Sequence, residues 1–336
     1  MLWQIWSLIS VKNKVNFQFS IDIMKENFLE DRPLWDGEFV DAHQHFWDPN
    51  VNYHPWLSKD RMIPFRYGDY SQIKRRYLPD DYLMDAAGFN VRESVYVETE
   101  WDSSDPVGEV RYATELNRTY GLPSAIVAQA WLDAPNAEEV LRQQASFSLV
   151  RSVRHKPKIM EEKSASGAQV TLMSDERWRR GYSLLESLGL HFDLQVSWRF
   201  FEDAIRLAND FPNTLIILNH TGLPENRHPD VLQGWHAAMS KLAACPNVMV
   251  KISGLGVLGE PWTIENNRWI VEETIMMYGA ERCMFASNFP VDSLCGTFSD
   301  IISGFKKISS VFDRDVQELL FCKTARKVYR TSENVI

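Results

Sequence analysis

Strand-like and helix-like segments alternate along most of this chain, and this alternation constrains its fold more than any other feature. Eight short apolar runs have the length and composition of strands, and they cover residues 39–43, 94–99, 124–132, 149–155, 191–196, 214–220, 248–253 and 282–287. Helical patterns lie between them, among them residues 175–189, 201–211, 264–278 and 315–329. Eight such alternations in 336 residues predict a parallel sheet closed into a (β/α)8 TIM barrel.

The alternation continues without an interdomain linker. We therefore expect one barrel domain over residues 37–332, preceded by an N-terminal extension over residues 1–36. No glycine-rich phosphate-binding loop follows any predicted strand, which argues against an open dinucleotide-binding sheet. The segment 48–79 is rich in aromatic residues and prolines and has no helical period, so we expect an ordered loop over one end of the barrel.

Composition narrows the choice of partners. The net charge is −9 and lysines and arginines do not cluster, which argues against nucleic acid as a ligand. No apolar stretch is long enough to cross a bilayer, so we expect no membrane partner. The four cysteines lie far apart and lack zinc-finger spacing. We therefore expect reduced thiols and a cytoplasmic protein. We expect a small-molecule substrate, and a homo-oligomer stays open.

Most of the predicted strands end in polar side chains. Because the active site of a TIM barrel lies at the carboxyl ends of its strands, these side chains are candidates for chemistry. The first strand ends in His43, and His45 lies just beyond it. In an extended strand such a pair projects from one face, as half of a metal site does. The candidates are His43, His45, Glu98, Arg154, Gln195, His220, Lys251, Asn288 and Asp292.

Three of these candidates allow two interpretations each. Glu98 and Arg154 either bind substrate or form an interior ion pair without a catalytic role. Lys251 either serves the site or extends to solvent from an outer layer of the barrel. In the site, Arg154 and Lys251 would favour a substrate that carries negative charge or a carbonyl group in need of polarisation.

Seven motifs together resemble the amidohydrolase-related family of TIM barrels, in the branch that includes sugar-acid lactonases and the pyrone-dicarboxylate lactonase. They are VDAHQHFWDP at 40–49, YHPWL at 53–57, VRH at 153–155, HFDLQV at 191–196, LNHTG at 218–222, VKISGL at 250–255 and MFASNFPV at 284–291. Their common order and spacing make the resemblance specific over nearly the whole barrel.

The resemblance implies hydrolysis at a carbonyl group by an activated water. In members of the family that use a metal, the histidine pair of the first strand binds a divalent ion, here His43 and His45 with zinc or manganese. A histidine of the sixth strand, matched by His220, positions water or substrate. A bound metal would lower the pKa of its water to about 7 and polarise the carbonyl. A metal-free mechanism stays open beside the one-metal mechanism, whereas a two-metal centre lacks its bridging ligand.

The chain departs from the family pattern at the end of the eighth strand. Lactonases of this branch usually have an aspartate where this chain has Asn288, and a neutral amide is a poor zinc ligand and no base. Three functions stay open. The chain is a lactonase in which Asp292 supplies the carboxylate, or a non-oxidative decarboxylase, or a barrel that binds a small carboxylate without turnover. We favour the lactonase.

Overall fold

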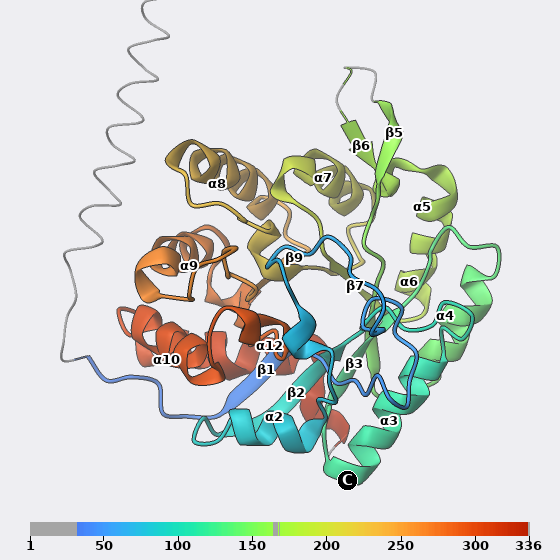
Figure 1. The fold of residues 1–336 in the computed structure, drawn as a ribbon. Helices are drawn as coiled ribbons and strands as arrows, with labels where there is room; N and C mark the ends of the chain where they lie inside the picture. Colours follow the sequence, from blue (N-terminus) through green and yellow to red (C-terminus); the bar gives the residue numbers. More distant parts are fainter. Residues whose placement is uncertain (1–31, 164–166, 168, 335–336) are drawn as a thin grey trace, which may run out of the picture.

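The computed structural model of the protein describes residues 32–163, 167 and 169–334, and a sheet of eight parallel strands forms its centre. Seven neighbouring pairs are parallel in the order β1-β2-β3-β4-β7-β8-β9-β10. The strands are β1 (Phe39–Gln44), β2 (Val91–Val97), β3 (Ala125–Gln129), β4 (Val150–Arg154), β7 (His191–Leu194), β8 (Ile216–Leu218), β9 (Val248–Ile252) and β10 (Cys283–Phe285). All eight predicted strands are present, and the TIM-barrel prediction is confirmed (Figure 1).

Helices surround the sheet on its outer side (Figure 1). They are α2 (Pro79–Asp85), α3 (Gly108–Tyr120), α4 (Ala137–Ala145), α5 (Glu176–Tyr182), α6 (Leu184–Ser187), α7 (Phe201–Asp210), α8 (Pro229–Ala243), α9 (Ile264–Tyr278), α10 (Phe298–Ser309), α11 (Arg314–Glu318) and α12 (Thr324–Tyr329). The bounds of α9 agree with the prediction because its ends are capped. The Thr263 hydroxyl accepts a hydrogen bond from Asn266 N, and Gly279 at φ 78° ends the helix.

Two predicted helices are interrupted. The segment 175–189 breaks between α5 and α6 at Ser183. The segment 315–329 contains a π-helical turn, Leu319–Lys323, between α11 and α12. This wider turn carries Phe321, whose ring packs against Phe39 and Phe285 of the sheet at 5.9 and 4.7 Å between centroids. Tertiary packing therefore overrides the regular helix here.

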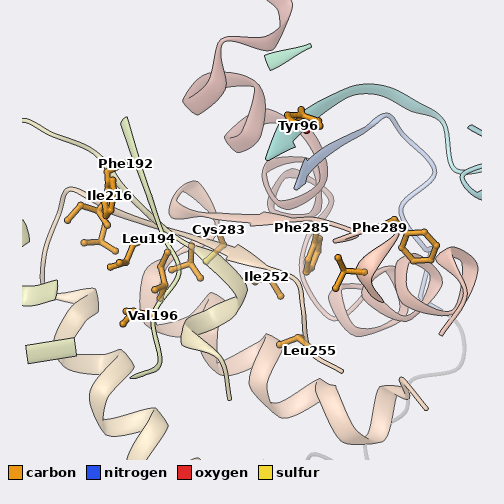
Figure 2. Packing of buried hydrophobic residues seen from close by; sticks show 14 of the residues in the cluster. Tyr96, Phe192, Leu194, Val196, Ile216, Ile252, Leu255, Cys283, Phe285 and Phe289 are labelled. Carbon is orange, nitrogen blue, oxygen red and sulfur yellow. The ribbon is translucent and has the colours of Figure 1, made fainter. Parts of the chain in front are cut away.

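Two apolar layers hold the barrel together. Outward side chains of the strands pack against the helices, and Figure 2 shows this cluster from close by, with Phe192, Ile216 and Cys283 among its labelled members. Inward side chains such as Val95 and Ile217 form a smaller interior cluster. Apolar side chains thus cover both faces of the parallel sheet, as βα crossovers require.

The first and last strands meet at a seam that closes the barrel. Backbone hydrogen bonds join Asn288 N to His43 O and His45 N to Phe289 O, each at 2.8 Å. Below them, the buried Asp41 carboxylate accepts hydrogen bonds from Ser287 N at 2.9 Å and from Ser287 Oγ at 2.5 Å. The seam therefore fixes His43, His45 and Asn288 relative to one another.

The segment between β1 and β2 crosses the mouth of the barrel (Figure 1). The indole N–H of Trp56 donates to Thr99 O at 2.8 Å, and the Arg66 guanidinium donates to Gly254 O at 3.2 Å, so the loop is tied to two sides of the mouth. An antiparallel hairpin, β5 (Ile159–Lys163) with β6 (Gln169–Thr171), extends from the loop after β4. The sequence pattern did not predict this hairpin.

The predicted N-terminal extension is described only in part, because residues 1–31 lie outside the described residues. Within residues 32–36, Trp35 packs on the barrel, where it is buried and stacked on Phe321 at 6.1 Å between centroids. Of the described helices, none has the length and hydrophobicity that a membrane span needs. The four cysteines are buried, free thiols.

Candidate active site

A cavity of about 320 Å³ opens at the carboxyl ends of the strands. The loop between β1 and β2 contributes an apolar wall that includes Trp56 and Phe65. Six of the candidates from the sequence line the cavity, and they are His45, Glu98, Arg154, Gln195, His220 and Asn288. His43, Lys251 and Asp292 are buried beneath or behind these residues and do not line it.

The hydrogen bonds of His45 fix its tautomer. Its Nδ1 lies 2.7 Å from Val97 O, and because a carbonyl oxygen only accepts, Nδ1 carries the proton. Burial, followed by the charge of Arg154, lowers the pKa of His45 to about 3, so the ring is neutral at working pH. Its Nε2 therefore holds a lone pair, and this atom lies 3.3 Å from the Asn288 side-chain oxygen.

His43 lies between the other two histidines. Its ring centroid is 4.9 Å from that of His45 and 4.6 Å from that of His220. Both ring nitrogens of His43 are buried without a hydrogen-bond partner among the described residues. Burial and then the charge of Lys251 hold the pKa of His43 well below its usual value. A buried polar side chain with no partner is rare and points to a functional position.

His220 is held in a strained backbone conformation. It has φ 56° and ψ 39°, and the β-branched Thr221 that follows has φ 48°. Such left-handed values cost about 1–3 kcal/mol for a residue other than glycine and occur most often at functional sites. The ring is fixed by a contact of 2.9 Å between Nδ1 and Ser253 Oγ. Gly254 packs so closely that a Cβ there would lie 2.5 Å from His220 Nδ1.

Asn288 connects Asp292 with the cavity. Its side-chain N–H donates to Asp292 Oδ1 at 2.6 Å, which directs its side-chain oxygen toward His45. Tyr67 OH also donates to Asp292 Oδ1, at 3.0 Å, while Asp292 Oδ2 is buried with no hydrogen-bond partner among the described residues. Burial raises the pKa of Asp292 to about 6. Asp292 therefore lies behind Asn288 and acts on the cavity through it.

Glu98 and Arg154 form an ion pair in the wall of the cavity. Arg154 Nε lies 2.5 Å from Glu98 Oε1, with 3% and 2% of the two side chains exposed. Arg154 also donates to Gln195 Oε1 at 2.9 Å. Because this contact occupies the oxygen of Gln195, the amide N–H groups are left to face the cavity. Glu98 and Arg154 thus form the interior ion pair and also line the cavity.

Lys251 lies deeper than the barrel mouth. Its ammonium is 2.7 Å from Asp193 Oδ1 and 4.8 Å from the centroid of the Tyr329 ring. Neither Lys251 nor Asp193 is exposed. Burial lowers the pKa of Lys251 to about 8. Lys251 therefore does not extend to solvent, and a substrate in the cavity would not touch it.

Arg66 is a cavity residue that the sequence pattern did not single out. Its guanidinium lies 4.5 Å above the centroid of the Tyr67 ring and 3.7 Å from Asp292 Oδ1. Lys156 also lines the cavity and pairs with Glu100. Arg66 lies in a loop without periodicity, so only its arginine side chain among aromatic residues marked it in the sequence.

The donor set beside the cavity is incomplete for a divalent metal. It consists of the rings of His43, His45 and His220 and the neutral amide of Asn288. Among the described residues, no three histidine, cysteine, aspartate or glutamate side chains are arranged to hold a metal ion. A catalytic zinc site takes three protein ligands from such side chains. The charge of Arg154 acts on His45, and that of Lys251 on His43, which opposes a dication. The residues present do not fit the metal that the resemblance implies.

Known proteins resemble this chain over most of its length. A family model described as Amidohydrolase matches residues 40–331. An uncharacterized protein, y4mH of Sinorhizobium fredii, is 37% identical over 300 residues, which are 88% of this chain and 99% of that protein. A protein of Burkholderia multivorans named L-fucono-1,5-lactonase is 25% identical over 277 residues, which are 79% of this chain and 86% of that protein.

Solved structures share the barrel. An amidohydrolase from Burkholderia multivorans with bound zinc superposes with a TM-score of 0.70 at 23% identity, over 88% of this chain and 99% of its own. The 2,6-dihydroxybenzoate decarboxylase from Rhizobium superposes with a TM-score of 0.59 at 13% identity, over 88% of this chain and 99% of its own. At these identities the likeness concerns the fold alone.

Proposed function

The chain belongs to the amidohydrolase family, and from that premise we propose that it opens a lactone of a sugar acid or a related carboxylate by attack of an activated water. The observation that carries the proposal is the facing pair His45 Nε2 and Asn288 Oδ1, two hydrogen-bond acceptors 3.3 Å apart at the edge of the cavity. A relative named as a lactonase supports this choice of reaction.

The two acceptors can hold one water by both of its hydrogens. In this orientation a lone pair of the water oxygen is directed away from His45 and Asn288, into the cavity where a carbonyl carbon can be placed. As the C–O bond forms, the proton on the histidine side passes to His45 Nε2, whose lone pair is available because the ring is neutral. Asn288 thus positions the water without acting as a base.

The opposite wall suits the developing oxyanion. The free N–H groups of Gln195 and the remaining N–H of the buried Arg154 are donors in the wall of the cavity, where such contacts can stabilise a tetrahedral intermediate. His45, which now carries the proton taken from the water, can pass it to the ring oxygen as the ring C–O bond breaks. His220 can donate a hydrogen bond to that oxygen, since Ser253 can donate to Nδ1 and leave Nε2 protonated. The product is an open-chain hydroxy carboxylate.

Three assays on the purified protein test the proposal. We expect sugar-acid lactones to release one proton per ring opened, which a pH indicator follows. Evolution of carbon dioxide from an aromatic or aliphatic carboxylate, without lactone opening, would replace the proposal with a decarboxylase. Thermal stabilisation by a carboxylate with neither signal would replace it with a binding protein.

The proposed mechanism needs no resident metal. We expect elemental analysis to find zinc and manganese far below one ion per chain, and lactone opening to persist after dialysis against a chelator. The Asn288→Asp variant supplies a carboxylate next to the two histidines, and elemental analysis is expected to find zinc bound to this variant after incubation with zinc. Asn136→Asp, which adds a carboxylate at an exposed position before α4 and away from the histidines, is the matched control. Stoichiometric metal in the native protein, with activity lost on chelation, would overturn the metal-free mechanism.

Asp292 is proposed to set the pH dependence through Asn288. As a carboxylate it accepts the Asn288 N–H; once protonated it can donate to the Asn288 oxygen, so the amide turns and presents N–H groups to His45 in place of the water acceptor. The pKa of about 6 therefore predicts that kcat/KM rises as pH increases through 6 and is then constant.

The Asp292→Asn variant tests this link. We expect it to lower kcat/KM by at least about a hundredfold and to remove the rise near pH 6. Tyr67→Phe, which removes the hydroxyl that donates to Asp292 and keeps Asn288, serves as the comparison. It keeps the pH limb, displaced to higher pH because a donor to the charged form is lost. Unchanged turnover in Asp292→Asn would remove Asp292 from the mechanism.

A further inference from the structure

A second cavity, of about 250 Å³, adjoins the active-site cavity at the same end of the barrel. Its walls come from the loop between β1 and β2 and from the segments that follow β7, β8 and β9. Arg66 and Leu223 line both cavities. A ligand that passes between these two residues would therefore occupy both spaces.

The second cavity is mainly apolar. Its apolar lining residues include Tyr67, Leu223, Pro224 and Leu258. The carboxylate in its wall, Glu225, is paired with Arg199 at 2.6 Å. This space consequently favours an uncharged, apolar group.

Arg66 makes the boundary selective. Its guanidinium is held by Gly254 O at 3.2 Å and by the Tyr67 ring at 4.5 Å, so the cation lies along the wall between the two spaces. The Tyr67 ring is itself confined, because a Cβ on Gly256 would lie 2.9 Å from it. The polar, reacting end of a ligand is thus favoured on the side of His45 and Arg154, and its apolar end on the side of Leu258.

We propose that the second cavity is a subsite for an apolar arm of the substrate, an inference that rests on the proposed lactone opening. The substrate class is a lactone whose ring carries an alkyl or aryl substituent. At about 30 Å³ for each small group, the space accommodates an arm of about four to six carbon atoms once clearances are allowed for. The ester group lies in the active-site cavity, and the arm passes Arg66 and Leu223.

A series of lactones that differ only in the arm tests the subsite. We expect kcat/KM to increase from δ-valerolactone through δ-hexalactone and δ-octalactone to δ-decalactone, by about threefold to fourfold for each methylene that becomes buried. Straight-chain carboxylates from acetate to decanoate should bind more tightly by the same factor for each methylene that becomes buried. The rise of the melting temperature that each carboxylate causes measures this affinity and does not depend on turnover.

The variant Leu258→Trp fills the cavity from its rim. Leu258 is 61% exposed, so a larger side chain can be accommodated without unfolding the barrel. The ratio of kcat/KM for δ-decalactone to that for δ-valerolactone is expected to fall by at least about tenfold, the loss of two buried methylenes. The matched control is Met276→Trp on the outer surface of α9, where Met276 is 72% exposed, and it leaves the ratio unchanged.

The outcomes separate the subsite from the reaction. Hydrolysis of all four lactones with one kcat/KM overturns the subsite and leaves the proposed function standing. Hydrolysis of none of the lactones, sugar-acid lactones included, overturns the proposed function. In that case stronger stabilisation by decanoate than by acetate, lost in Leu258→Trp and kept in Met276→Trp, supports the subsite, and equal stabilisation by both overturns it.

Discussion

Replacing His45 by alanine is expected to lower kcat/KM for lactone opening by about a thousandfold, within the range found when a positioned general base is lost. The variant loses the acceptor that holds the water and the atom that takes its proton. Val97 O also loses its donor, which costs about 1–3 kcal/mol of stability. This cost is below the free energy of unfolding of a typical domain, about 5–15 kcal/mol, so we expect the variant to fold. Circular dichroism and a melting curve establish this before kinetics are measured.

Imidazole in the buffer separates chemistry from structure. His45 lines an open cavity, so added imidazole can enter the space that the variant leaves and should restore at least about tenfold of the lost activity. His236→Ala is the matched control. That histidine lies on the outer surface, 2.9 Å from Glu273, and its removal should leave turnover unchanged. Full activity in His45→Ala would show that another group takes the proton.

Replacing Glu98 by glutamine is expected to destabilise the protein by about 3–5 kcal/mol, because it leaves the Arg154 charge buried without its partner. Urea unfolding measures the loss. In the double variant Glu98→Gln with Arg154→Met, most of the stability should return, since neither charge is then buried, while lactone opening falls by about a hundredfold or more with the loss of the oxyanion donor.

An exposed ion pair provides the comparison. Glu138→Gln removes the partner of Arg142 on the surface of α4, where about 60% of each side chain is exposed, and should cost no more than about 0.5 kcal/mol. Equal losses in Glu98→Gln and Glu138→Gln would contradict the role given to the buried pair.

The stability that Glu98 contributes should also depend on pH. Burial alone would raise the pKa of Glu98, but the charges of Arg154 and Lys156 outweigh it, and the pKa lies below its usual value. The carboxylate therefore stabilises the fold above the pKa of the unfolded chain, about 4.3, and loses this contribution as the pH falls through the lower folded value. The difference between the native protein and Glu98→Gln should shrink accordingly on acidification.

The sequence was sufficient to predict the barrel because each strand is short, apolar and separated from the next by a helical pattern. The sequence pattern does not predict the bounds of a helix or strand where tertiary contacts decide them. The π-helical turn at Leu319–Lys323 exists because Phe321 packs on the sheet, and no local pattern reports this. The β5–β6 hairpin was missed because β5 reads Ile-Met-Glu-Glu-Lys and is largely exposed, so it lacks the alternation that marks a half-buried strand.

The candidate site was predicted unevenly for a related reason. Strand ends indicate which residues converge, and six candidates do line one cavity. The sequence pattern does not predict how deep a side chain lies along the barrel axis. Lys251 and Asp292 were therefore expected to line the site, whereas the structure places them behind it. Arg66 was not anticipated because its position depends on the course of a long loop.

The seam between β1 and β10 ties the appearance of activity to the last stage of folding. His45 and Asn288 are 243 positions apart in the chain, and the backbone contacts that align them are those that close the ring of strands. Because closing a loop of this length costs chain entropy, we expect the contact to form late, after much of the chain has lost its freedom. A nascent or partly refolded chain with most of its strands paired would thus be inactive. The recovery of turnover during refolding would report when the ring of strands closes.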